Sequence, residues 1–195
     1  MILNEIMNTN IQESDTLAVK EPMSHESYNL ERHWEVIDTI TYVATGKQEV
    51  RRYFNTVVNT CSNLIACLMK SQSGFRGIQY WAVGSGNPNM SNTNPDTPSV
   101  NDTKLQVETF RKAIKASDIV FLDRNNAVTD SITNKIQISI TFLENEANGE
   151  LREFGLFGGT ATSAKNSGIM INRKIHPLIY KTSGMRLDRI IRITF

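Results

Sequence analysis

The chain has 195 residues, of which 39% are hydrophobic and 21% are charged, and its formal net charge is +1. This composition is ordinary for a soluble globular protein of one or two domains. No apolar run reaches the roughly 18–20 residues that span a bilayer, so we expect no membrane partner. The N-terminus also lacks the basic flank and the long apolar stretch of a secretory signal.

The near-zero net charge hides an uneven distribution along the chain. Residues 1–46 contain two basic and eight acidic residues, a net charge of −6, and the remainder contains 19 basic and 12 acidic residues, a net charge of +7. We therefore divide the chain into an acidic N-terminal arm, residues 1–45, and a body, residues 46–195. An acidic arm on a basic body is expected to lie on a body surface, its own or a neighbour's. A tail that touches nothing explains the charge equally well.

The first half of the chain is expected to contain an extended arm, a strand and one long helix. Residues 1–33 show no sustained period, and the β-rich run 33–44 predicts one strand or two short ones. From Gln48 to Ser71 there is no Gly or Pro, and apolar residues recur at helical spacing, so we expect a helix of roughly 36 Å. It would pack on the chain's own sheet, on a partner, or on both. Cys61 and Cys67 would point away from each other on it, as small side chains in a reducing compartment.

The middle of the chain predicts a strand, a long loop and a short helix. The run 78–83 reads as a buried strand that ends at Gly84-Ser85-Gly86, and residues 87–102 form a polar loop with three prolines. Thr103 and Gln106 suggest a capping box for a helix over 104–113, with Glu108 facing Arg111 and Lys112.

The rest of the chain is expected to be β-structure. Ile136, Ile138, Ile140 and Phe142 alternate with polar residues, which predicts a strand with one buried face. Asn148-Gly149 predicts a hairpin turn, and Pro177 predicts an edge strand or a bulge. The strands are expected near residues 117–122, 132–143, 151–157, 169–180 and 185–195. The predicted fold class is α+β, mainly β: an antiparallel β-sandwich-like C-terminal domain, one long amphipathic N-terminal helix and an extended N-terminal arm.

The sequence offers few residues in patterns that support chemistry. His25, His33 and His176 lack metal-ligand spacing, and Gly84-Ser85-Gly86 lacks the third glycine and immediate helix of a dinucleotide site. Glu153 is expected to pair with an arginine, although a hydrolase that uses it with a second carboxylate is an alternative. We therefore expect no cofactor, no metal and no enzymatic activity. The basic C-terminal stretch is expected to pair with the acidic arm rather than with nucleic acid.

Four segments in fixed order give the chain a resemblance to a known group of proteins. They are IQYWAVGSG (78–86), DTKLQVETFR (102–111), EFGLFGG (153–159) and SGIMINRKIHPLIYKT with RIIRITF (167–182 and 189–195). Together they resemble structural proteins of bacteriophage tail fibres and baseplates, in tailed phages and related contractile injection systems. Residues 1–45 lie outside the resemblance. Because the chain ends at Phe195 without a repetitive shaft, it resembles an anchoring or adaptor domain.

The resemblance implies a virion structural protein that is assembled in the host cytoplasm. Its partners would be other tail, baseplate or fibre proteins and further copies of itself, in a trimer or a ring. A glycan-binding module of a tail fibre, with Tyr80, Trp81 or the 87–102 loop stacking on a sugar, is the alternative. The residues expected at assembly interfaces come from the helix, the arm and the last strand: Val50, Phe54, Val57, Leu64, Leu68, Trp34, Glu31, Glu35, Arg186, Arg189 and Arg192.

Overall fold

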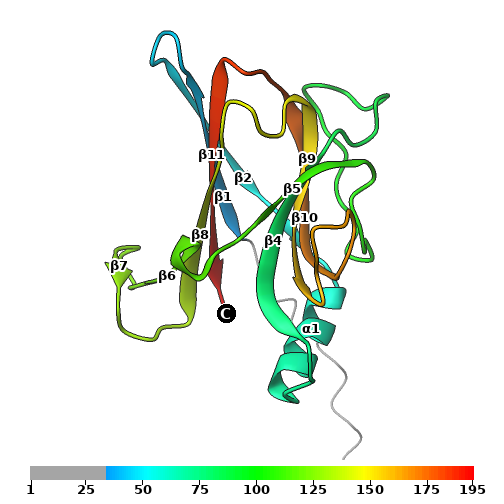
Figure 1. Ribbon diagram of the computed structural model, residues 1–195, viewed down its shortest axis with the longest axis vertical. Helices are drawn as coiled ribbons and strands as arrows, with labels where there is room; N and C mark the ends of the chain where they lie inside the picture. Colours follow the sequence, from blue (N-terminus) through cyan, green and yellow to red (C-terminus); the bar gives the residue numbers. More distant parts are fainter. Residues whose placement is uncertain (1–33) are drawn as a thin grey trace, which may run out of the picture. The chain divides into compact units, whose positions relative to one another are not determined.

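A computed structural model describes residues 34–195, and the first 33 residues of the predicted arm lie outside the described part of the chain. The described residues are mainly β-structure, arranged as two antiparallel sheets that face each other (Figure 1). The prediction of a mainly β, sandwich-like fold is therefore confirmed.

Sheet A has six strands in the order β2-β1-β11-β8-β6-β7. Their bounds are β1 Glu35–Tyr42, β2 Gln48–Phe54, β6 Ile119–Leu122, β7 Val128–Thr129, β8 Lys135–Phe142 and β11 Met185–Thr194. The C-terminal strand β11 is central and pairs with both β1 and β8.

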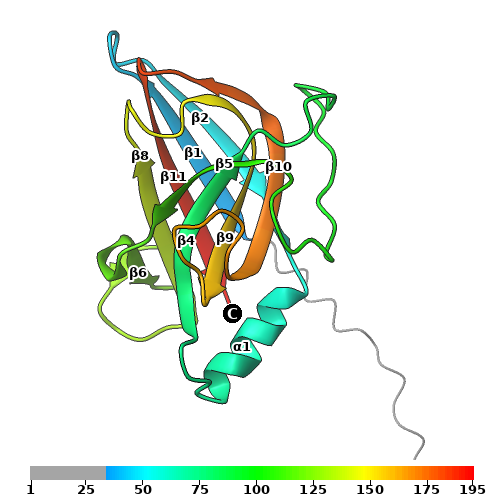
Figure 2. The same ribbon diagram turned by 45° about the vertical axis from the view of Figure 1, so that its right-hand side comes forward.

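Sheet B has five strands in the order β3-β10-β9-β4-β5. Their bounds are β3 Thr56–Val57, β4 Arg76–Gly84, β5 Glu108–Ala113, β9 Gly149–Gly159 and β10 Ile169–Lys181. The helix α1, Thr60–Met69, lies at one end of the sheets, near the C-terminus (Figure 2). A short 3-10 turn, η1 (Ala116–Asp118), precedes β6.

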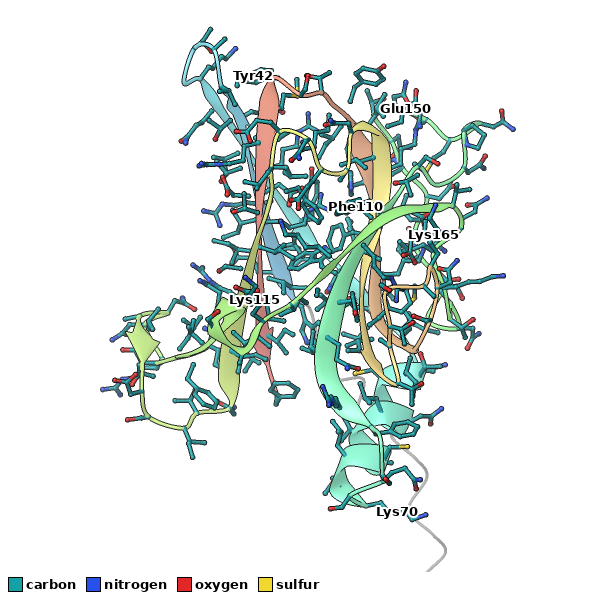
Figure 3. All side chains as sticks on the ribbon, viewed as in Figure 1. Tyr42, Lys70, Phe110, Lys115, Glu150 and Lys165 are labelled. Atoms are coloured by element: carbon teal, nitrogen blue, oxygen red, sulfur yellow. The ribbon has the colours of Figure 1, made fainter. Side chains whose placement is uncertain are left out.

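The main core lies between the sheets, where side chains from both inner faces fill the space (Figure 3). Phe142 of sheet A and Trp81, Phe154 and Leu156 of sheet B are fully buried there. Phe110, labelled in Figure 3, meets Phe142 edge-on at 6.1 Å between ring centroids. Alternation in β8 and β11 places every second side chain in this core, as the period of two predicts.

The predicted helix over residues 48–71 is wrong in its first half. Residues 48–54 form β2, which pairs with β1 in continuous antiparallel register, and only Thr60–Met69 are helical. The run that includes Val50, Tyr53 and Phe54 is rich in β-branched and aromatic residues, which favour a strand when a neighbouring strand is available. Its exposure alternates along the strand, with period two.

Two other local predictions are also wrong. Residues 108–113 form β5 against β4 instead of a helix. The Asn148-Gly149 turn does not make a hairpin, because β8 belongs to sheet A and β9 to sheet B, so the turn carries the chain from one sheet to the other. The prediction at Pro177 is confirmed, since the register between β10 and β9 shifts between Ile175 and Ile179.

Candidate interaction surface

Glu153 anchors the loop before β5 to the outer side of sheet B. Its carboxylate is fully buried and accepts the backbone N–H groups of Val107 at 2.8 Å and Gln106 at 3.2 Å. Arg173 on the adjacent strand β10 donates to the same carboxylate at 2.6 Å and to Asp102 at 2.8 Å. Burial opposes the charge on Arg173, but the hydrogen bonds and charges of the two carboxylates raise its pKa. The prediction that Glu153 pairs with an arginine is confirmed.

A second buried ion pair joins β5 to the loop at 160–168. Arg111 contacts Glu108 at 2.7 Å and donates to the carbonyl oxygens of Thr162 and Ser167. Residues three apart point to opposite faces of a regular strand, but the register between β4 and β5 shifts here. The extra residue of this bulge brings the pair to one face. The predicted Glu108–Arg111 contact therefore exists without the predicted helix.

These contacts cover the outer side of sheet B. A second hydrophobic cluster, which includes Leu105, Phe157 and Met170, lies beneath the attached segments. The close approach of the loop depends on Gly84, because a Cβ at this position would clash with the Val107 carbonyl and the Glu153 carboxylate. From Leu151 to Gly159 every residue of β9 is buried, so sheet B has core on both sides.

Inside the sandwich, a buried polar cluster joins the two sheets. Arg189 of β11 donates to both carboxylate oxygens of Asp38 on β1, at 2.6 and 2.5 Å, and both side chains are fully buried. Its guanidinium also lies 4.3 Å from the ring centroid of Phe154 in sheet B. This pair confirms, for these residues, the expected pairing of the acidic N-terminal region with the basic C-terminal stretch.

His176 of β10 completes this cluster from sheet B. Its Nδ1 lies 2.8 Å from the Pro177 carbonyl oxygen, which can only accept, so Nδ1 carries the proton. Its Nε2 is then free to accept from Arg189 at 3.3 Å. Complete burial, and next the charge of Arg189, lower the pKa of His176 well below its usual value. The histidine is therefore neutral at physiological pH.

The outer face of sheet A is a different kind of surface, which no described element covers as the loops cover sheet B (Figure 1). A row of polar side chains crosses four of its strands. Arg52 of β2 contacts Glu35 of β1 at 2.8 Å, Arg192 of β11 contacts Glu35 at 3.2 Å, and Arg192 donates to Gln137 of β8 at 3.0 Å. We call this surface the outer face of sheet A.

Apolar side chains interrupt this polar row, mainly at its β2 side. Val50 is 56% exposed and Phe54 is 60% exposed. Ile37 of β1 and Ile190 of β11 are direct partners in the register and lie on the same face. The register also places Thr39 in the middle of the face, opposite Val50 on one side and Asp188 on the other. Mixed apolar and charged surfaces of this kind are suited to protein contacts.

A hollow of about 440 Å³ borders the same face. Ser139, Thr141 and Asp188 contribute from sheet A, Lys112 contributes from the end of β5, and Lys115 contributes from the segment that follows β5. Lys112 donates a hydrogen bond to the Thr141 carbonyl oxygen at 2.7 Å. This bond lies on the part of the β8 edge that does not pair with β6.

The structure brings five of the predicted interface residues together on the outer face of sheet A: Val50, Phe54, Glu35, Arg186 and Arg192. Trp34 and Leu64 are buried, and with Leu68 they line an apolar hollow of about 240 Å³ beside α1. Val57 is half-buried on β3. Arg189 is in the core, and Glu31 lies outside the described residues.

Sequence reasoning missed Thr39, Ile37, Arg52 and Ile190 as members of this face. The signal was present for Arg52, because Gln48, Val50, Arg52 and Phe54 also alternate with period two. The helical pattern over the same residues concealed it.

Trp81 is fully buried between the sheets and is therefore unavailable as a sugar-stacking residue. Tyr80 is half-buried and lies under the guanidinium of Arg111, at 5.4 Å from the ring centroid. Among residues 34–195 there is no group of three or more His, Cys, Asp or Glu side chains that could hold a metal ion.

No protein-family model matches the chain, and no curated protein is significantly similar to it. Within the described part of the chain, none of the helices has the length and hydrophobicity needed to cross a membrane.

Proposed function

We propose that the chain is a structural component of a virion, an adaptor or anchor in a phage tail, baseplate or tail fibre that acts through protein–protein assembly. One observation carries this proposal: five charged residues of the resembling segments hold the module together. Asp102, Glu108, Arg111, Glu153 and Arg173 form the buried contacts that attach three of these segments to one another. In this view the segments that recur in such proteins make a rigid scaffold.

The outer face of sheet A is the surface that this scaffold presents to its neighbours in the particle. It is broad, it carries charges of both signs, and Val50 and Phe54 are exposed at its margin. Sheet B is already covered on its outer side by the chain's own loops. The assembly contacts are therefore made through sheet A and not through the outer side of sheet B.

Photo-crosslinking from both sides of the module tests this function. A benzoylphenylalanine at Thr39, in the middle of the outer face, should crosslink to another tail protein in particles encoded by the same genome. The control position is Lys165, an exposed residue in the loop that lies over sheet B (Figure 3). Absence of the chain from purified particles, or equal crosslinking from both positions, would contradict the proposal.

A further inference from the structure

The strand β2 has an edge that no other described strand occupies. Among the described strands it pairs with β1 alone, over seven consecutive residue pairs without a register shift. Edge strands are usually protected by charged side chains, proline, a bulge or a covering element. The β2 sequence QEVRRYF has no proline and its pairing has no bulge, so its protection lies in the charges of Glu49, Arg51 and Arg52, while Val50 is exposed. The edge can therefore accept another strand only in a register that offsets these charges.

A second copy of β2 is the occupant that charge complementarity selects. Two copies of an edge strand can extend a sheet about a two-fold axis perpendicular to it, and the strands are then antiparallel. Directly opposite residues must lie on the same face of the sheet, because side chains alternate. The axis must therefore lie midway between one residue and the same residue of the second copy, which are then directly opposite each other. We name each register by that residue.

Only one of the central registers avoids repulsion. An axis through Glu49, Arg51 or Arg52 places that residue against its own copy, with like charges directly opposite, which is destabilising. An axis through Val50 instead places Glu49 opposite Arg51 of the second copy, and Arg51 opposite Glu49 of the second copy. Val50 then meets Val50, and both exposed apolar side chains lose contact with water.

We propose that two copies of this chain pair through β2 in the register centred on Val50, so that their A sheets form one continuous sheet. Within one chain, Arg51 already contacts Glu49 at 2.6 Å. Pairing in this register turns two such contacts into a group of four alternating charges.

This inference rests on the proposed assembly role, because it names the partner at one margin of the outer face of sheet A. It nevertheless has its own test, on the purified full chain without particles. If the purified chain is a dimer but gives no crosslink from Thr39 in particles, the proposed function is contradicted and the pairing through β2 stands. If Thr39 gives a crosslink in particles but the purified chain is a monomer, the pairing is contradicted and the proposed function stands.

The test uses charge reversal and sedimentation equilibrium. The wild-type chain should have twice the 22.0 kDa mass of one chain. Glu49→Arg and Arg51→Glu should each be monomeric, because each places like charges opposite each other in the copy–copy register. An equimolar mixture of the two variants should regain the dimer mass. Glu49→Arg is positively charged at both positions 49 and 51, and Arg51→Glu is negatively charged at both, so opposite charges face each other in the mixed pair. A monomeric wild type, two dimeric variants or a monomeric mixture would each overturn the proposal.

Cysteine crosslinking gives a second measurement if either variant fails to fold. Opposite Cα atoms in an antiparallel pair are about 4.5–5.5 Å apart, within the range for a disulfide. Val50→Cys, in a Cys67→Ser background, should therefore form a covalent dimer under mild oxidation. Glu49→Cys is the matched control, because Glu49 lies two residues out of register with its own copy. A covalent dimer from Glu49→Cys but not from Val50→Cys would overturn the register.

Discussion

Removal of the Asp38 carboxylate should destabilise the fold more than most single substitutions. In Asp38→Ala the guanidinium of Arg189 would lose both of its bonds to that carboxylate, at 2.6 and 2.5 Å, while it stays fully buried. His176 would still accept one hydrogen bond, but a neutral imidazole cannot balance the charge. Leaving one charge of a buried pair uncompensated costs about 3–5 kcal/mol. That is a large share of the roughly 5–15 kcal/mol that stabilises a typical domain.

Equilibrium urea unfolding measures this loss. With a slope of about 2 kcal/mol per molar urea, the midpoint of Asp38→Ala should fall by roughly 2 M. Far-UV circular dichroism reports the sheets, and tryptophan fluorescence reports the core, where Trp34 and Trp81 are buried. Coincident transitions from the two probes would justify treating the unfolding as two-state.

A double variant separates loss of the ion pair from loss of packing. Asp38→Leu combined with Arg189→Met replaces the pair with apolar side chains, and such replacements are often neutral or stabilising by about 1–4 kcal/mol. The double variant should therefore be more stable than Asp38→Ala. A cost below about 1 kcal/mol for Asp38→Ala, or a double variant as unstable as the single one, would refute the account of Arg189 as a charge that depends on Asp38.

Three further predictions concern other buried groups. Burial lowers the pKa of His176 and keeps it neutral in the folded chain, whereas the histidine of the unfolded chain binds a proton below about pH 6.5. The free energy of unfolding should therefore fall as the pH drops below about 6.5, by about 1.4 kcal/mol per pH unit from this group. His176→Gln should flatten the dependence of the urea midpoint on pH between about 6.5 and 5.5. Glu153→Ala should cost about 1–3 kcal/mol, because the backbone N–H groups of Gln106 and Val107 lose their acceptor while Arg173 keeps Asp102, and should speed proteolysis within residues 85–107; unchanged cleavage would contradict its anchoring role. Gly158→Ala should lower the free energy of unfolding by about 1–3 kcal/mol, because its Cβ would lie under 3.0 Å from the Gly77 carbonyl oxygen. The control is Gly77→Ala, whose methyl group meets nothing within 4 Å and should leave the melting temperature unchanged.

The β-rich half of the fold could be predicted from the sequence because burial alternates there with period two. Ile136, Ile138, Ile140 and Phe142 mark the inward face of β8 without ambiguity. Glu153 could be assigned to an arginine because a carboxylate within a buried strand needs compensation. Its partner, Arg173, could not be chosen, because pairing of β9 with β10 is a tertiary property.

Residues 48–57 show why the helix prediction failed. Val50, Tyr53, Phe54 and Val57 satisfy the helical spacing, and Val50 and Phe54 also satisfy the alternation of a strand. Local pattern alone could not decide between them. The available hydrogen bonds along β1 decided in favour of the strand. The Asn148-Gly149 turn was misread for a similar reason, since a turn sequence does not say whether its two strands belong to one sheet.

The outer face of sheet A could be predicted in part. Glu35 and Arg192 were identified from charge, but their contact across a separation of 157 residues depends on β11 lying beside β1. Arg189 had the same charge signal but lies on the opposite face, because it is three positions from Arg192 and side chains alternate between the two faces of a strand.

The central place of β11 has a consequence for synthesis of the protein. The β1–β2 hairpin leaves the ribosome before its neighbour in the sheet, because residues 185–194 are made more than 130 residues later. At about 5–20 residues per second, the hairpin waits on the order of ten seconds with its apolar side uncovered. Chains that stall before residue 185 cannot close the sheet and would be substrates for chaperones and proteases. Only translation through the closing strand completes sheet A.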